Sequence, residues 1–201
     1  MDRISRAVGA LRAVDKTMER VIGRFGRPPR RVPDPNGPFA ALARAICFQQ
    51  LAGAAASTIH GRFEALVDGA VTPDRVLGVS PARLRKAGLS AAKARSIVDL
   101  ARRCEDGSIP LDRLAALDDA EVAARLTEVW GVGIWTVQMF LISELGRLDV
   151  WPTKDLGIQR GYARAYRRRA PPTERDLERL GAKFRPYRSV AAWYLWQVAD
   201  A

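Results

Sequence analysis

The sequence predicts an all-α protein built from ten or more short helices. Apolar residues recur at helical spacing through most of the 201 residues. Proline and glycine interrupt this pattern at short intervals, and Leu148–Trp151 is the only short strand candidate. With 48% hydrophobic residues, the chain can bury a sizeable core, either as one domain or as two small lobes that share a cleft.

The first half of the chain reads as helices separated by proline and glycine. Apolar spacing predicts a helix over residues 2–24, and the proline-rich segment Gly26–Pro38 predicts a loop. Glycine and leucine at 51–53 interrupt two helices, and a glycine turn at Lys86–Ser90 precedes another, for which Ser90 is a suitable N-cap. The helices expected here are 39–50, 54–67, 73–79, 81–87 and 91–104.

The second half continues in the same way. Asp118 or Asp119 begins a helix that ends near Glu128, and a glycine turn at 129–133 leads into the next helix. Thr153 is the expected N-cap of a later helix, which places Asp155 in its first turn, where the helix dipole stabilises a negative charge. The helices expected here are 110–117, 119–128, 135–145, 154–166, 173–184 and 187–198.

The charge favours an acidic partner, nucleic acid first. There are 33 Lys and Arg residues against 22 Asp and Glu, a net charge of +11. Residues 160–188 hold ten basic and three acidic residues, which form either a solvated face or a surface that contacts phosphates. Lys86, Lys93 and Arg95 near the first glycine turn admit the same two interpretations.

Composition also argues against several classes of protein. Two cysteines, Cys47 and Cys104, and the single His60 cannot supply a four-ligand zinc site or an iron–sulfur cluster without many carboxylates. No apolar run is long enough to span a bilayer, and the N-terminus lacks a signal-peptide pattern. We therefore expect a cytoplasmic protein with no membrane partner, associated with the nucleoid if the source is bacterial.

The segment Val129-Trp130-Gly131-Val132-Gly133 is a candidate phosphate site. Glycine permits a tight turn, and the N–H groups of the helix that follows have no partner within that helix. Such a helix start binds anions readily. An ordinary glycine-terminated connection between helices is the alternative interpretation, and a first-turn acid that only satisfies the dipole is the corresponding alternative for Asp155.

The stretch LTEVWGVGIWTVQMFLISELGRLDVWPTKDLGIQ resembles the helix-hairpin-helix-Gly/Pro-Asp superfamily of base-excision DNA glycosylases. Within that superfamily the chain is similar to the 3-methyladenine DNA glycosylase II family, through Ala45–Gly53, Leu84–Arg95 and Phe184–Ser189 as well. The resemblance runs from about Phe39 to Val198. It implies two helical lobes with a cleft between them, about 39–110 in one and the N-terminus with about 111–201 in the other, and a DNA-binding helix-hairpin-helix motif at one edge.

The resemblance also implies roles for individual residues. The hairpin would grip a DNA phosphate through Gly131, Gly133 and Thr136, and backbone carbonyls would hold a Na⁺ or K⁺ ion beside it. Those carbonyls would belong to Thr127, Val129 and Val132. No cofactor is otherwise required.

At the lesion, the resemblance implies base flipping. Gln50 and Leu51 match the loop that enters the duplex, with Leu51 as the candidate wedge or, alternatively, a core leucine at a helix break. Asp155 matches the catalytic carboxylate. Trp135 and Trp196 match aromatic pocket positions, and Met139 replaces an aromatic residue of some relatives.

Members that also cut the DNA strand carry a nucleophilic lysine where this chain has Trp135, and Lys154 is not expected to substitute for it. The sequence thus predicts a monomeric, monofunctional glycosylase that removes alkylated purines, such as 3-methyladenine and 7-methylguanine, from double-stranded DNA. The alternatives are a non-catalytic helix-hairpin-helix DNA-binding protein and a glycosylase for uracil, hypoxanthine or ethenoadenine.

Overall fold

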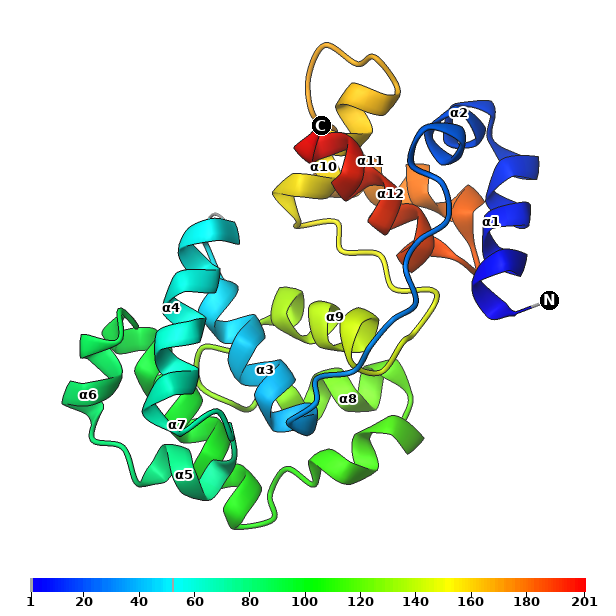
Figure 1. The fold of residues 1–201 in the computed structure, drawn as a ribbon. Coiled ribbons are helices and arrows are strands. Elements are labelled where there is room, and N and C mark those ends of the chain that lie inside the picture. The colour runs from blue at the N-terminus through cyan, green and yellow to red at the C-terminus, as the bar shows by residue number, and fades with distance from the viewer. Residues whose placement is uncertain (1, 52) are drawn as a thin grey trace. The chain divides into compact units, whose positions relative to one another are not determined.

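The computed structural model describes residues 2–51 and 53–201, and this part of the chain contains helices and loops without a strand (Figure 1). The all-α class is confirmed, and the strand candidate Leu148–Trp151 is loop. Contacts divide the chain into two units, one formed by the residues up to Arg31 with Gly146–Ala201 and the other by Val32–Leu145. No helix in the described ranges is long and apolar enough to cross a membrane.

The unit formed by both chain ends packs around the C-terminal helix. Helices α10 and α12 lie against each other, and α1 and α2 also contact α12. The core includes Leu11, Ile22, Tyr162, Phe184 and Leu195, all nearly inaccessible to solvent. Its elements are α1 (Arg3–Val14), α2 (Lys16–Phe25), α10 (Leu156–Ala165), α11 (Glu174–Gly181), η2 (Ala182–Phe184) and α12 (Arg188–Asp200).

The Val32–Leu145 unit is built around α3 and α7. Helix α3 packs against α4, α7 and α9, and α7 packs against α5 and α6. Leu42, Ile46, Phe63, Ile97 and Phe140 are among its buried side chains. Its elements are α3 (Gly37–Phe48), α4 (Gly53–Leu66), α5 (Pro73–Leu77), α6 (Pro81–Lys86), α7 (Ala91–Glu105), η1 (Leu111–Ala116), α8 (Asp119–Leu126) and α9 (Ile134–Ser143).

Three boundaries differ from the sequence-based expectation. The helix expected over 2–24 is interrupted at Asp15, whose extended backbone and side chain cap α2 by accepting a hydrogen bond from the Met18 N–H at 2.7 Å. Helix α3 begins at Gly37, inside the expected loop, because Pro38 occupies a first-turn position that needs no N–H donor. The helix expected over 110–117 is a short 3₁₀ segment.

The division of the chain also differs from the expected one. Residues 111–145 were expected to join the C-terminal lobe, but they belong with 32–110. The reason is packing, because α3 contacts both η1 and α9 while α8 packs on α9. The boundary consequently follows α9, where Gly146 begins the loop that leads to α10.

Candidate active site and DNA-binding hairpin

Helices α8 and α9 enclose the glycine turn, as the sequence predicts. Asp118 and Glu121 form a capping box at the start of α8, and Thr127 is the C-cap residue at its end. Gly131 has φ +75°, and a Cβ atom there would lie 2.3 Å from the Ser96 hydroxyl oxygen of α7. A side chain at 131 is thus disfavoured both by the backbone conformation and by the contact with α7.

Gly133 has a different reason to be glycine. Its φ of −97° is open to any residue, and a Cβ atom would meet nothing within 4 Å. It is the N-cap of α9 and has no side chain to cap the first-turn amides, which lack carbonyl partners within the helix. The space beside Gly133 and the positive end of α9 together form a surface suited to an anion.

The three carbonyls expected to bind a cation lie within this hairpin. The Val129 carbonyl accepts a hydrogen bond from the Val132 N–H at 3.0 Å and keeps a second lone pair. The Thr127 N–H donates to the Ala123 carbonyl at 3.0 Å. Neutral carbonyl oxygens suit a hard cation such as Na⁺ or K⁺, and the ion at Thr127, Val129 and Val132 stays a prediction.

The C-cap residue of α3, Gln49, supports the hairpin. The Gln49 amide nitrogen donates to the Gly131 carbonyl at 3.1 Å and to the Thr136 hydroxyl at 2.8 Å. Thr136 is only 1% exposed. The expected contact of Thr136 with DNA is therefore wrong for its side chain, because that side chain is buried and its hydroxyl accepts the hydrogen bond from Gln49. The sequence pointed to Gln50 and not to Gln49, because only the fold shows which of these neighbours faces the hairpin.

The loop after α3 presents the wedge candidate to solvent. Gln50 has φ +56° and is exposed, and Leu51 is 40% exposed although it is a large apolar residue. Lys93 of α7 donates to the carbonyls of Cys47 and Gln49 at 2.7 and 2.8 Å. Lys93 thus anchors the end of α3, where its charge complements the helix dipole.

In the other unit, Asp155 begins α10 as its N-cap. Its Oδ1 atom accepts hydrogen bonds from the Ile158 N–H and from the Trp196 indole N–H, both at 2.8 Å. The expectation that Thr153 caps the helix is wrong, because a turn places the Asp155 N–H 3.1 Å from the Pro152 carbonyl and starts the helix two residues later. The two donors fix the orientation of the Asp155 carboxylate.

Close packing between α10 and α12 makes this pair possible. A Cβ atom on Gly161 would lie 1.9 Å from the Leu195 carbonyl oxygen, so only glycine allows the helices to approach this closely. A Cβ atom on Gly157 would lie 2.9 Å from Trp196 Cδ1 and 3.0 Å from Asp155 Oδ1. Two glycines that the sequence analysis did not single out therefore hold the carboxylate and the indole together.

The loop before Asp155 is tied to the start of α12. Arg188 donates through Nε to Asp149 Oδ1 at 2.8 Å, and Arg185 donates to Asp149 Oδ2 at 3.0 Å. The Val150 N–H donates to the Ser189 hydroxyl at 2.9 Å. Trp151 is buried and donates from its indole to the Leu177 carbonyl at 2.8 Å. Helix α12 thus anchors the loop through the bond from Arg188 to Asp149, and it anchors Asp155 through the bond from Trp196.

The remaining predicted pocket residues lie on α9. Trp135 and Met139 are both half-buried, and their separation of four residues places them on one helical face. They belong to the Val32–Leu145 unit with the hairpin, whereas Asp155 and Trp196 belong to the other unit. The indole N–H of Trp196 orients Asp155, a role that the sequence did not predict, and its place in a base pocket stays a prediction.

Part of the basic stretch 160–188 has structural partners. Lys183 pairs with Asp15, Arg188 with Asp149, and Arg164 donates to the Ala199 carbonyl at 2.6 Å. The solvated face or phosphate surface predicted from this stretch accordingly draws on fewer side chains than the sequence count indicates. Arg167 and its two arginine neighbours are exposed at the end of α10.

A glycine hairpin suited to an anion, followed by a proline-containing loop and an aspartate that caps the next helix, defines a class of protein. The chain belongs to the HhH-GPD superfamily of base excision DNA repair proteins, which matches residues 43–186. It is 33% identical to DNA-3-methyladenine glycosylase 1 of Schizosaccharomyces pombe, over 98% of this chain and 88% of that protein.

Two solved structures are similar in both fold and sequence. One is the 3-methyladenine DNA glycosylase of Schizosaccharomyces pombe in complex with abasic DNA, with a TM-score of 0.92, 32% identity, and coverage of 98% of this chain and 97% of that chain. The other is a DNA-3-methyladenine glycosidase of Bacillus halodurans, with a TM-score of 0.80, 34% identity, and coverage of 97% and 89%.

Proposed function

We propose that the chain is a monofunctional DNA glycosylase of base excision repair, which hydrolyses the N-glycosidic bond of alkylated purines such as 3-methyladenine and 7-methylguanine. The observation that carries this proposal is the Asp155 carboxylate, held by the Ile158 N–H and the Trp196 indole at the start of α10. A DNA-binding module would need the hairpin alone, and helix capping accounts for the Ile158 hydrogen bond but not for the Trp196 indole that also donates to Asp155.

The oriented carboxylate acts on the sugar. When the bond between C1′ and the base nitrogen breaks, its electron pair leaves with the base and positive charge develops on C1′ and the ring oxygen. Asp155 stabilises that charge, and because its orientation is already fixed, little reorganisation is needed during the reaction. Water then attacks C1′ and loses a proton, which leaves an abasic site.

The base is held by aromatic and polarisable side chains. An N-alkylated purine is cationic and departs as a neutral molecule, so it needs little acid catalysis. Trp135 offers an aromatic face that attracts a cation by about 0.5–2 kcal/mol. Met139, on the same face of α9, is flexible enough to accept bases of different shape.

The reaction stops at the abasic site because Trp135 cannot form a Schiff base. Abasic DNA is also the ligand in the similar Schizosaccharomyces pombe structure. We place the protein with the chromosome, in the cytoplasm for a bacterial source, and we expect it to act as a monomer.

The hairpin supplies the grip on DNA. The first-turn amides of α9 and the open space at Gly133 would bind a backbone phosphate. A Na⁺ or K⁺ ion on the carbonyls of Thr127, Val129 and Val132 would add positive charge there. We expect no other cofactor, so base release should persist in EDTA.

Base release from methylated duplex DNA tests the proposal. We expect free 3-methyladenine and 7-methylguanine from the wild-type protein, and a rate about 10²- to 10³-fold lower from Asp155→Asn, which removes the charge. Asp118→Asn is the matched control, because Asp118 also caps a helix, α8, and asparagine caps nearly as well.

Each outcome has a definite meaning. Absence of any free base, with methylated, uracil, hypoxanthine and ethenoadenine substrates alike, would contradict the enzyme and favour the DNA-binding module. Full activity of Asp155→Asn would contradict the mechanism. Strand cleavage with a covalent adduct trapped by borohydride would contradict the monofunctional assignment.

A further inference from the structure

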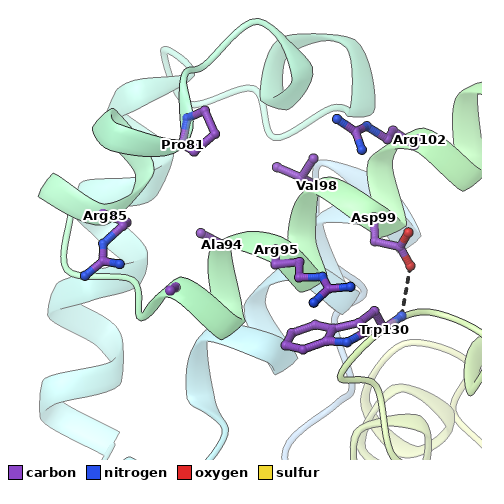
Figure 2. A pocket seen from close by; sticks show the side chains of 9 residues that line it. Pro81, Arg85, Ala94, Arg95, Val98, Asp99, Arg102 and Trp130 are labelled. Carbon is purple, nitrogen blue, oxygen red and sulfur yellow. Dashed lines mark hydrogen bonds between the residues drawn. The ribbon is translucent and has the colours of Figure 1, made fainter.

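A basic pocket lies beside the hairpin, in the Val32–Leu145 unit. Its volume is about 390 Å³, and Arg85, Arg95, Arg102 and Trp130 line it. Figure 2 shows Arg85 on α6 and Arg102 on α7 at different sides of the pocket, with Trp130 of the hairpin below Arg95. The Arg95 guanidinium lies 4.2 Å from the centre of the Trp130 ring.

Helix α7 forms the floor of the pocket. Arg95 and Arg102 are seven residues apart and therefore share one helical face. Ala91 and Ala94 of the same helix also line the pocket, and their short side chains leave it hollow. The long arginine side chains consequently surround a recess instead of covering it.

The three arginines have no acidic partner in the part of the chain that the structure describes. Within residues 2–51 and 53–201, no carboxylate lies within 4 Å of the guanidinium groups of Arg85, Arg95 or Arg102. The one acid that lines the pocket is Asp99, and it accepts hydrogen bonds from the Trp130 N–H at 2.9 Å and from Arg103 at 3.1 Å. The pocket thus has an uncompensated positive charge suited to phosphate.

The pocket is continuous with the hairpin. Trp130 directly precedes Gly131, whose Cα packs against Ser96 on α7. The Asp99–Trp130 hydrogen bond and the Arg95–Trp130 contact join the same two segments. Because these contacts connect the hairpin to α7, a duplex whose phosphate lies on the hairpin would bring its next phosphates toward the pocket.

We propose that this basic pocket binds backbone phosphates of the DNA that flanks the hairpin-bound phosphate, with Arg85 and Arg102 as the contacting side chains. The proposal rests on the proposed action on DNA and extends the binding surface beyond the hairpin. Guanidinium groups contact phosphates without reading the base, so this pocket would add affinity without sequence preference.

The experiment measures how DNA affinity depends on salt. Each phosphate contact adds about 0.9 to the slope of log K against log salt concentration. Removing both side chains with Arg85→Gln/Arg102→Gln should lower the slope for an undamaged duplex by about 1 to 2. The matched control is Arg62→Gln/Arg113→Gln, which removes two exposed arginines of the same unit that do not line the pocket.

A second pair of variants and a second probe make the result decisive. Arg85→Lys/Arg102→Lys keeps both charges and should retain most of the slope. Equal slopes for the pocket pair and the control pair would overturn the proposal, as would a lysine pair that behaves like the glutamine pair. Tryptophan fluorescence during titration with inorganic phosphate tests a free-anion site. A response that only the pocket variants lose, with DNA slopes unchanged, would also overturn the proposal.

These binding measurements do not depend on base release. If the wild-type protein binds DNA but frees no base, the proposed activity fails and the slopes still decide the role of the pocket.

Discussion

Gly157→Ala tests whether the packing between α10 and α12 orients the catalytic candidate. The new methyl group would lie 2.9 Å from Trp196 Cδ1 and 3.0 Å from Asp155 Oδ1, so it would sit against both members of the hydrogen-bonded pair. The indole must move away, and the 2.8 Å hydrogen bond from Trp196 to Asp155 must lengthen or bend.

Two opposing effects set the change in the free energy of unfolding for Gly157→Ala. Alanine is favoured over glycine in a helix by about 1 kcal/mol. Overpacking a well-packed site costs about 1–3 kcal/mol. We therefore expect the free energy of unfolding to fall by about 0–2 kcal/mol, a small change. The rate should change more, because displacing a catalytic group by a fraction of an ångström to 1 Å can lower it by about 10- to 100-fold.

The assay is single-turnover release of methylated bases at saturating DNA, together with urea unfolding. Gly9→Ala is the control, because Gly9 lies inside α1 with nothing within 4 Å of a Cβ atom. This control should gain about 0.5–1 kcal/mol of stability and keep the wild-type rate. If Gly157→Ala gains as much stability and releases base as fast as Gly9→Ala, the reasoning is refuted.

Four further predictions concern the hairpin and a buried histidine. Gly131→Ala should lower the free energy of unfolding by about 2–4 kcal/mol, through its positive φ and its contact with α7. Gly133→Ala should leave stability within about 0.5 kcal/mol but weaken DNA affinity, and equal affinities for wild type and Gly133→Ala would contradict a phosphate at that site. Gln49→Leu should cost about 1–2 kcal/mol in thermal unfolding, because it leaves the Thr136 hydroxyl without its donor. Burial lowers the pKa of His60 below its usual 6.5. Because the unfolded chain then binds more protons than the folded chain, the free energy of unfolding should fall as pH drops from 7 towards about 5. His60→Gln should flatten that dependence, and an unchanged pH profile in this variant would exclude His60 as its source.

Local chemistry explains why much of the fold was predictable. Ser90 caps α7 as the sequence predicts, and Asp118, one of the two candidates at 118 and 119, caps α8, because a cap needs only a side chain and an amide three residues away. Gly131 has the positive φ expected of the turn. The class of protein also followed from the sequence, because its motifs lie close together in the chain and in a characteristic order.

Contacts between distant residues explain the errors. Thr153 and Asp155 are both good N-caps, and the turn from Pro152 to Asp155 starts the helix after Asp155, but only the packing of α10 on α12 places the Trp196 indole beside that carboxylate. Lys93 could have been a surface residue, and only the position of α3 beside α7 shows that it holds the carbonyls of Cys47 and Gln49. No local pattern encodes these contacts.

By itself, then, the sequence determined the helical class and the hairpin, and it selected Asp155 as the candidate catalytic carboxylate and Trp135 as a candidate pocket residue. Tertiary structure alone decided that Gly157 and Gly161 must lack side chains, that Gln49 braces the hairpin, and that three arginines line one pocket. The physical reason is range. Caps and turns depend on neighbours within a few residues, whereas a close approach of two helices depends on partners tens of residues away, whose identity constrains a position only after the chain has folded.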